Sequence, residues 1–113
     1  MSLITVSAVV NADTSFAFRP YGLPENKNIS VLKESTTGLY QIIYDTVFIS
    51  PPVVTVTQAW LGNFGGGGGE TLDNAVVNDI TNTYATVKVG DGNGNGQWRS
   101  FTIVLTGYEN VGA

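Results

Sequence analysis

The chain has 113 residues, the length of one domain, and it contains neither cysteine nor histidine. These absences exclude disulfides, Cys/His zinc sites and every catalytic mechanism that needs a thiolate or an imidazole. The net charge is −4 and the five basic residues are scattered singly, so the clustered cations of a nucleic-acid binder are missing. Charged residues make up only 12% of the chain, so we expect its surface either to consist of Thr, Asn, Ser and Gly or to be partly covered by neighbouring subunits, which would indicate a homo-oligomer.

Apolar and polar residues alternate through most of the chain, and the helical period of 3.6 is nowhere sustained. In chain order, the predicted strands cover residues 3–10, 14–19, 29–33, 38–46, 52–60, 74–80, 83–89 and 99–107. Three of them should point large side chains into a core, namely Tyr40, Ile42 and Tyr44; Val54, Val56 and Trp60; and Phe101, Ile103 and Leu105. Residues 1–113 are thus predicted to form a single all-β domain, an antiparallel β-sandwich of about seven strands.

Ten of the 14 glycines fall within residues 62–69 and 90–96. Glycine weakens a strand, so both segments are predicted to be loops, and each is expected to join two strands as a hairpin. Trp60 and Phe64 flank the first loop and are expected to pack in the core or between subunits.

The second loop, residues 90–97, begins like a calcium-binding loop, because Asp91, Asn93 and Asn95 alternate with glycines. An EF-hand also needs a bidentate carboxylate at its twelfth position, where this chain has Thr102, and it needs flanking helices. The lysine-containing glycine loop that cradles phosphate is missing as well. We therefore predict a turn that binds no metal or other cofactor, with a weak calcium site as the lesser alternative.

The candidate ligand-binding residues are Asp91, Asn93, Asn95, Trp98 and Arg99. Carboxylates and amides hydrogen-bond to sugar hydroxyls, and an aromatic ring packs against the apolar face of a sugar. The structural alternative is that Trp98 packs at the edge of the core while Arg99 pairs with a nearby acid. No pair of carboxylates facing across a cleft is indicated, so we do not expect an enzyme.

Two segments resemble a known family. Residues 40–58, YQIIYDTVFISPPVVTVTQ, are similar to the middle of H-type lectins, and residues 99–110, RSFTIVLTGYEN, resemble their last strand. The same arrangement is similar to receptor-binding and tip domains of phage tail fibres. The resemblance implies an antiparallel β-sandwich that forms a trimer with a sugar site at the subunit junction. It transfers no binding residue, because this chain lacks the histidine and the preceding arginine with which H-type lectins read their sugar.

We therefore expect a non-catalytic carbohydrate- or receptor-binding module, a homotrimer that presents a cell-surface glycan to loops at its end. A purely structural trimeric subunit of a virion or another assembly is the alternative. We expect no signal peptide before the first predicted strand, and no apolar run is long enough to insert into a membrane. The sequence does not decide where the protein is located. A virion and, before release of the protein, the cytoplasm both remain open as locations.

Overall fold

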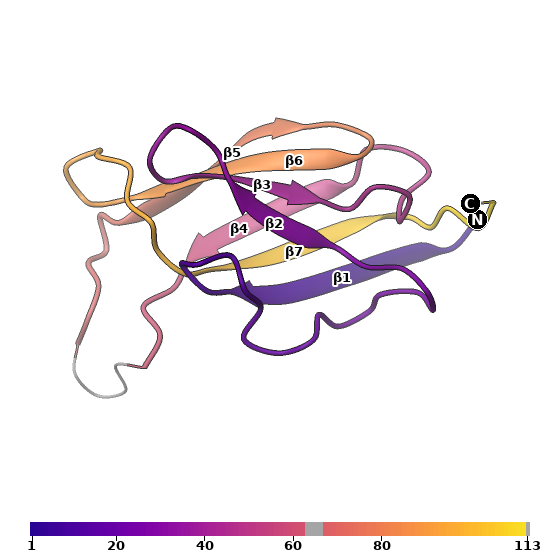
Figure 1. Ribbon diagram of the computed structural model, residues 1–113, viewed down its shortest axis with the longest axis horizontal. Helices are drawn as coiled ribbons and strands as arrows, with labels where there is room; N and C mark the ends of the chain where they lie inside the picture. The colour runs from indigo at the N-terminus through magenta and orange to yellow at the C-terminus, as the bar shows by residue number, and fades with distance from the viewer. Residues whose placement is uncertain (63–66, 113) are drawn as a thin grey trace.

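The structure is a computed structural model and describes residues 1–62 and 67–112. Seven strands, with no helix among these residues, form two antiparallel sheets (Figure 1). The three-stranded sheet has the order β1–β7–β4, built from Leu3–Val10, Phe101–Tyr108 and Val53–Gln58. The four-stranded sheet has the order β2–β3–β6–β5, built from Ser30–Lys33, Leu39–Ile43, Tyr84–Gly90 and Asn74–Ile80. The predicted all-β class is confirmed, and the arrangement is compatible with a β-sandwich.

The core follows the alternation of the sequence, because every second residue of a strand points to the same face. The three-stranded sheet buries Val6, Ala8, Val10, Val54, Phe101, Ile103 and Leu105. The four-stranded sheet buries Tyr40, Ile42, Ala85, Val87 and Val89. Beyond the strands, the buried apolar residues are Ile29, Tyr44, Val47 and Phe48. The inward positions predicted for the Tyr40 and Phe101 strands are therefore confirmed.

Two buried tyrosines attach loops to the core through their hydroxyl groups. The hydroxyl of Tyr40 donates a hydrogen bond to the carbonyl oxygen of Ala12 at 2.7 Å. The hydroxyl of Tyr44 contacts the carbonyl oxygens of Thr81 and Tyr84, in the turn between β5 and β6. Burial raises the pKa of both tyrosines to about 12, because the charged phenolate is poorly solvated there.

The strand predicted over residues 14–19 is wrong. This segment instead lies along the free edge of β1 as irregular chain, touching it through isolated bridges from Phe16 to Val10 and from Tyr21 to Ser7. Thr14 has a φ of 79°, and Pro20 has no N–H to donate, so a regular ladder cannot form. The segment covers an edge that would otherwise leave backbone groups unpaired.

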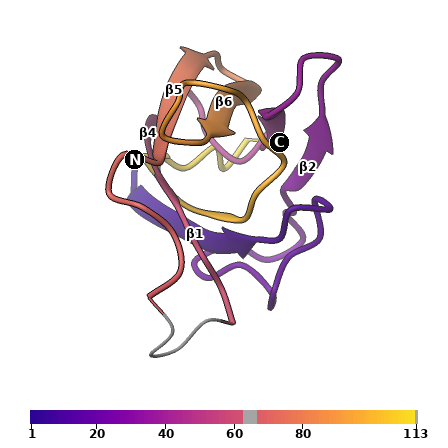
Figure 2. The same cartoon turned by 90° about the vertical axis from the view of Figure 1, so that its left-hand side faces the viewer.

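Both glycine-rich segments cross from one sheet to the other, so the two predicted hairpins are wrong. The connection from β4 to β5 and the connection from β6 to β7 each leave one sheet and enter the other. β7 pairs with β1 on one side and β4 on the other, which leaves no edge for β6. Both crossings lie at one end of the molecule, which faces the viewer in Figure 2, and both termini lie at the opposite end (Figure 1).

Candidate functional site

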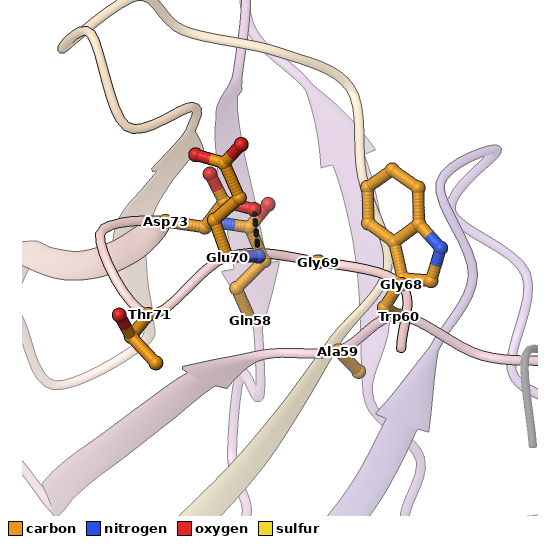
Figure 3. A pocket seen from close by; sticks show the side chains of 8 residues that line it. All are labelled: Gln58, Ala59, Trp60, Gly68, Gly69, Glu70, Thr71 and Asp73. Atoms are coloured by element: carbon orange, nitrogen blue, oxygen red, sulfur yellow. Dashed lines mark hydrogen bonds between the residues drawn. The ribbon is translucent and has the colours of Figure 1, made fainter. Parts of the chain in front are cut away.

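The two crossings border an open cavity, which we call the end hollow. It has a volume of about 340 Å³ and is lined by Trp60, Gly69, Glu70, Asp73, Asp91, Gly92, Asn93 and Arg99. It adjoins a second cavity of about 360 Å³ beneath the β4–β5 connection, lined by Gln58, Ala59, Trp60, Gly68, Gly69, Glu70, Thr71 and Asp73 (Figure 3). Each volume falls in the range of small-ligand sites, about 300–1,000 Å³.

Arg99 connects the elements around the end hollow. Its guanidinium lies 3.1 Å from the carboxylate of Asp73 and donates to the side-chain oxygen of Gln58 at 3.2 Å. The guanidinium carbon lies 5.2 Å from the centre of the Trp60 ring, within the range of a cation–π contact. A single cation therefore joins the end of β4, the residue before β5 and the segment that leads into β7.

Gln58, the last residue of β4, bridges the two sheets. Its side-chain amide donates to the carbonyl oxygen of Asn74 at 2.9 Å and to that of Gly90 at 2.7 Å. These carbonyls belong to the start of β5 and the end of β6. The two strands that border the crossings are thus held at a fixed separation from β4.

Asp91 shapes the loop that forms one wall of the end hollow. One of its carboxylate oxygens accepts the backbone N–H of Asn93 at 2.9 Å and that of Asn95 at 3.0 Å. These bonds, the one from Asn95 foremost, hold the pKa of Asp91 below its usual range because they stabilise the charged form. Asp91 thus makes the turn-forming contacts expected of it.

Glycine is required in this loop for two reasons. Gly94 has a φ of 84°, a conformation that side chains other than Asn and Asp rarely adopt. A side chain at Gly96 would overlap the carbonyl oxygen of Thr37, in the turn before β3. The loop therefore packs directly against a neighbouring turn, backbone to backbone.

Three of the five predicted site residues come together. Asp91, Asn93 and Arg99 line the end hollow. Asn95 instead lines another cavity, beside β5 and β6, which shares Asp91 and Gly92 with the end hollow. The fifth, Trp98, lies outside both of these cavities.

Trp98 packs at the edge of the core, as the structural alternative expected. Its ring centre is 5.1 Å from that of Tyr40, with the two planes at 79°. The amine of Lys33 lies 4.9 Å from the centre of the Trp98 ring. These contacts direct Trp98 toward β2 and β3 and give it a clear structural function.

Trp60, Glu70 and Asp73 are lining residues that the sequence analysis missed. The prediction that Trp60 points inward with Val54 is wrong, because β4 ends at Gln58 and Trp60 is 51% exposed. The adjacent glycine run is the sequence signal that Trp60 belongs to a loop at the surface. No sequence signal pairs Asp73 with Arg99, because that pairing depends on two separate crossings. Phe64 lies outside the described residues.

The end hollow has an excess of negative charge. Three carboxylates, from Glu70, Asp73 and Asp91, surround the one guanidinium of Arg99. Asp73 also accepts the backbone N–H of Glu70 at 3.0 Å, so its two partners fix its position (Figure 3). Over residues 1–62 and 67–112, no three acidic side chains are grouped closely enough to hold a metal ion.

Comparison of the chain with protein-family models, curated proteins and solved structures finds no match. Within the described part of the chain, no helix could cross a bilayer. Fold and site together define an all-β domain of two antiparallel sheets with an acidic, tryptophan-bearing cavity at one end.

Proposed function

We propose that the chain is a non-catalytic carbohydrate- or receptor-binding module that takes a saccharide in the end hollow. The observation that supports this proposal is the half-exposed ring of Trp60 beside hydrogen-bonding groups of Glu70 and Asn93. An indole offers an apolar surface to the C–H groups of a sugar, while carboxylates and amides accept and donate bonds to its hydroxyls.

The charge of the end hollow favours a neutral saccharide. Its carboxylates outnumber its cations, and Arg99 already interacts with Asp73 and Trp60. A sialylated or sulfated glycan would meet repulsion without an available counter-charge. We therefore expect neutral glycans, rich in hydroxyl groups, to bind in preference to acidic ones.

The contacts of Asp73 support binding without catalysis. Glycoside hydrolysis needs one carboxyl group that donates a proton and a second that acts as base or nucleophile. Asp73 contacts Arg99 and accepts the N–H of Glu70, so its carboxylate is engaged in holding the two crossings together. Hydrogen bonds from its own loop keep the pKa of Asp91 low, which disfavours a role as proton donor.

The likeness of residues 40–58 and 99–110 to H-type lectins and to phage tail-fibre tips supports a homotrimer as the working form. In that assembly, the end hollow would present its ligand to a glycan-bearing cell surface. Light scattering tests the copy number, and a mass of 12.0 kDa at every concentration would contradict any oligomer.

A glycan array probed with the full chain tests the proposed ligand class. We expect neutral glycans to give signal and Trp60→Ala to weaken binding at least tenfold. Trp98→Phe is the matched control, because it alters the other tryptophan of the chain, which lies outside the end hollow. Loss of binding in Trp98→Phe but not in Trp60→Ala would move the site to Trp98, and binding of acidic glycans alone would contradict the charge argument.

A purely structural subunit of an assembly is the second candidate function. The observation that favours it is the absence of charged residues from the whole three-stranded sheet, which suits a surface that other subunits cover. A silent glycan array together with a stable oligomer would favour this second function.

A further inference from the structure

The three-stranded sheet carries no charged residue. All five basic and all nine acidic residues lie outside β1, β4 and β7. The four-stranded sheet, in contrast, includes Lys33, Asp79 and Lys88. Sheet surfaces that stay in water normally carry charges, which prevent association with other sheets. The two sheets therefore differ in charge, because the three-stranded sheet has no charged residue and the four-stranded sheet has several.

The outer face of the three-stranded sheet consists of every second residue from 3 to 9, from 53 to 57 and from 102 to 108, and we call it the uncharged face. Val104 lies at its centre, paired in register with Ser7 on one side and Thr55 on the other. Val53 is 69% exposed and Leu3 is 63% exposed. The face is thus a continuous surface of threonine, valine and other uncharged side chains.

Some polar groups of the uncharged face already have partners within the sheet. The hydroxyls of Thr5 and Thr106 already bond to each other across the strands at 3.2 Å. The backbone groups of β7 bond to β1 and β4 on its two sides. For these groups, the loss of hydrogen bonds to water, which usually opposes burial of a polar surface, is small.

We propose that the uncharged face binds a second copy of this chain. A partner that placed a charge on this face would have that charge desolvated without a counter-charge. Another copy supplies a matching uncharged surface, and a symmetric contact needs only one such surface on each subunit. The acidic groups that give each copy its net charge of −4 are all kept off the face, so little repulsion opposes the contact.

The size of the face sets the expected strength of the contact. With strands about 4.8 Å apart and residues about 3.4 Å apart, its flat area is on the order of 300 Å². A standard interface buries about 800 Å² on each partner, so this face alone predicts association that depends on concentration. A symmetric contact of this kind joins two copies and does not by itself build a ring of three, so the inference adds a pairwise contact to the proposed trimer.

Sedimentation of the full chain from micromolar to millimolar concentration, compared between two lysine variants, tests the inference. Val104→Lys places a charge at the centre of the uncharged face. Val76→Lys is the matched control, because Val76 is an exposed strand valine of the other sheet, paired opposite Lys88. We expect the parent chain and Val76→Lys to associate and Val104→Lys to stay at the monomer mass. Thr55→Lys, beside Val104, should act in the same way and serves if Val104→Lys fails to fold.

The outcomes separate the two proposals. A parent chain that stays monomeric at every concentration overturns both the oligomer and the face. An oligomer that survives Val104→Lys and Thr55→Lys overturns the face alone. If Val76→Lys also prevents association, the added charge itself, and not its position, is the cause. That result would likewise overturn the proposal that the uncharged face binds a second copy.

Discussion

Arg99 and Asp73 form an ion pair that joins the two chain crossings, with 3.1 Å between a guanidinium nitrogen and a carboxylate oxygen. Both side chains are largely shielded from water, with exposed fractions of 22% and 11%. Shielding strengthens the attraction, and it also makes either group unfavourable when its partner is removed. The pair should therefore contribute more than an ion pair on an open surface.

The first prediction concerns this pair. Arg99→Ala and Asp73→Ala should each destabilise the fold by about 1–2 kcal/mol, and the double variant by less than the sum. We expect a coupling energy of about 1 kcal/mol, at the upper end for partly exposed pairs. Urea unfolding of the four proteins measures it, and strictly additive effects would show that the two groups do not interact in solution.

The second prediction concerns Trp98 and its packing against Tyr40. Trp98→Ala should lower the free energy of unfolding by about 2–3 kcal/mol, because it removes a partly buried aromatic ring from the edge of the core. Trp98→Phe should retain most of that stability. Denaturant unfolding measures both variants. A loss below about 1 kcal/mol in Trp98→Ala would contradict the packing role assigned to this ring.

The third prediction concerns alkaline pH. The pKa of both Tyr40 and Tyr44 is raised by burial, from 10.0 to about 12. Between these values the folded chain holds protons that the unfolded chain releases, so stability is complete below pH 10 and falls as the pH rises toward 12. The urea midpoint should follow this course. Tyr44→Phe should make the decline shallower, and a midpoint independent of pH would refute the burial effect.

The fourth prediction concerns acidic pH and the loop of Asp91. The N–H groups of Asn95 and Asn93 hold the pKa of Asp91 below its usual value of 3.8. This stabilisation is present above that value and is lost as the pH falls through the lower, folded pKa. Amide hydrogen exchange at Asn93 and Asn95 should speed up in acid beyond its intrinsic pH dependence. Asp91→Asn should show the faster relative exchange already at neutral pH, and unchanged protection there would contradict the prediction.

The strands could be predicted because alternation records which side chains are buried. Tyr40 and Ile42, like Phe101 and Ile103, occupy the inward positions that their spacing indicates. The alternation is a local signal, and it carries no information on which sheet a strand joins. The two glycine-rich segments were therefore mistaken for hairpins, although both are crossings.

The candidate site was predictable only in part, for the same reason. Asp91, Asn93 and Arg99 are close in sequence, so one loop accounts for all three. Trp60 and Asp73 join them only because the other crossing ends beside that loop. Trp98 is predicted as a site residue because an aromatic ring suits a sugar, yet its ring packs against Tyr40 and lies outside the end hollow.

The pairing of β1 with β7 has a consequence for synthesis on the ribosome. Leu3 pairs with Tyr108 and Val10 with Phe101, so the first of the seven strands is paired with the last. β1 must therefore wait for β7 before the two strands can form their part of the sheet. This pairing forms only after residues 101–108 have been made, and pairing between residues so distant in sequence is slow. A nascent chain stalled before residue 101 lacks the centre of one sheet and should be a target for chaperones that bind exposed apolar strands.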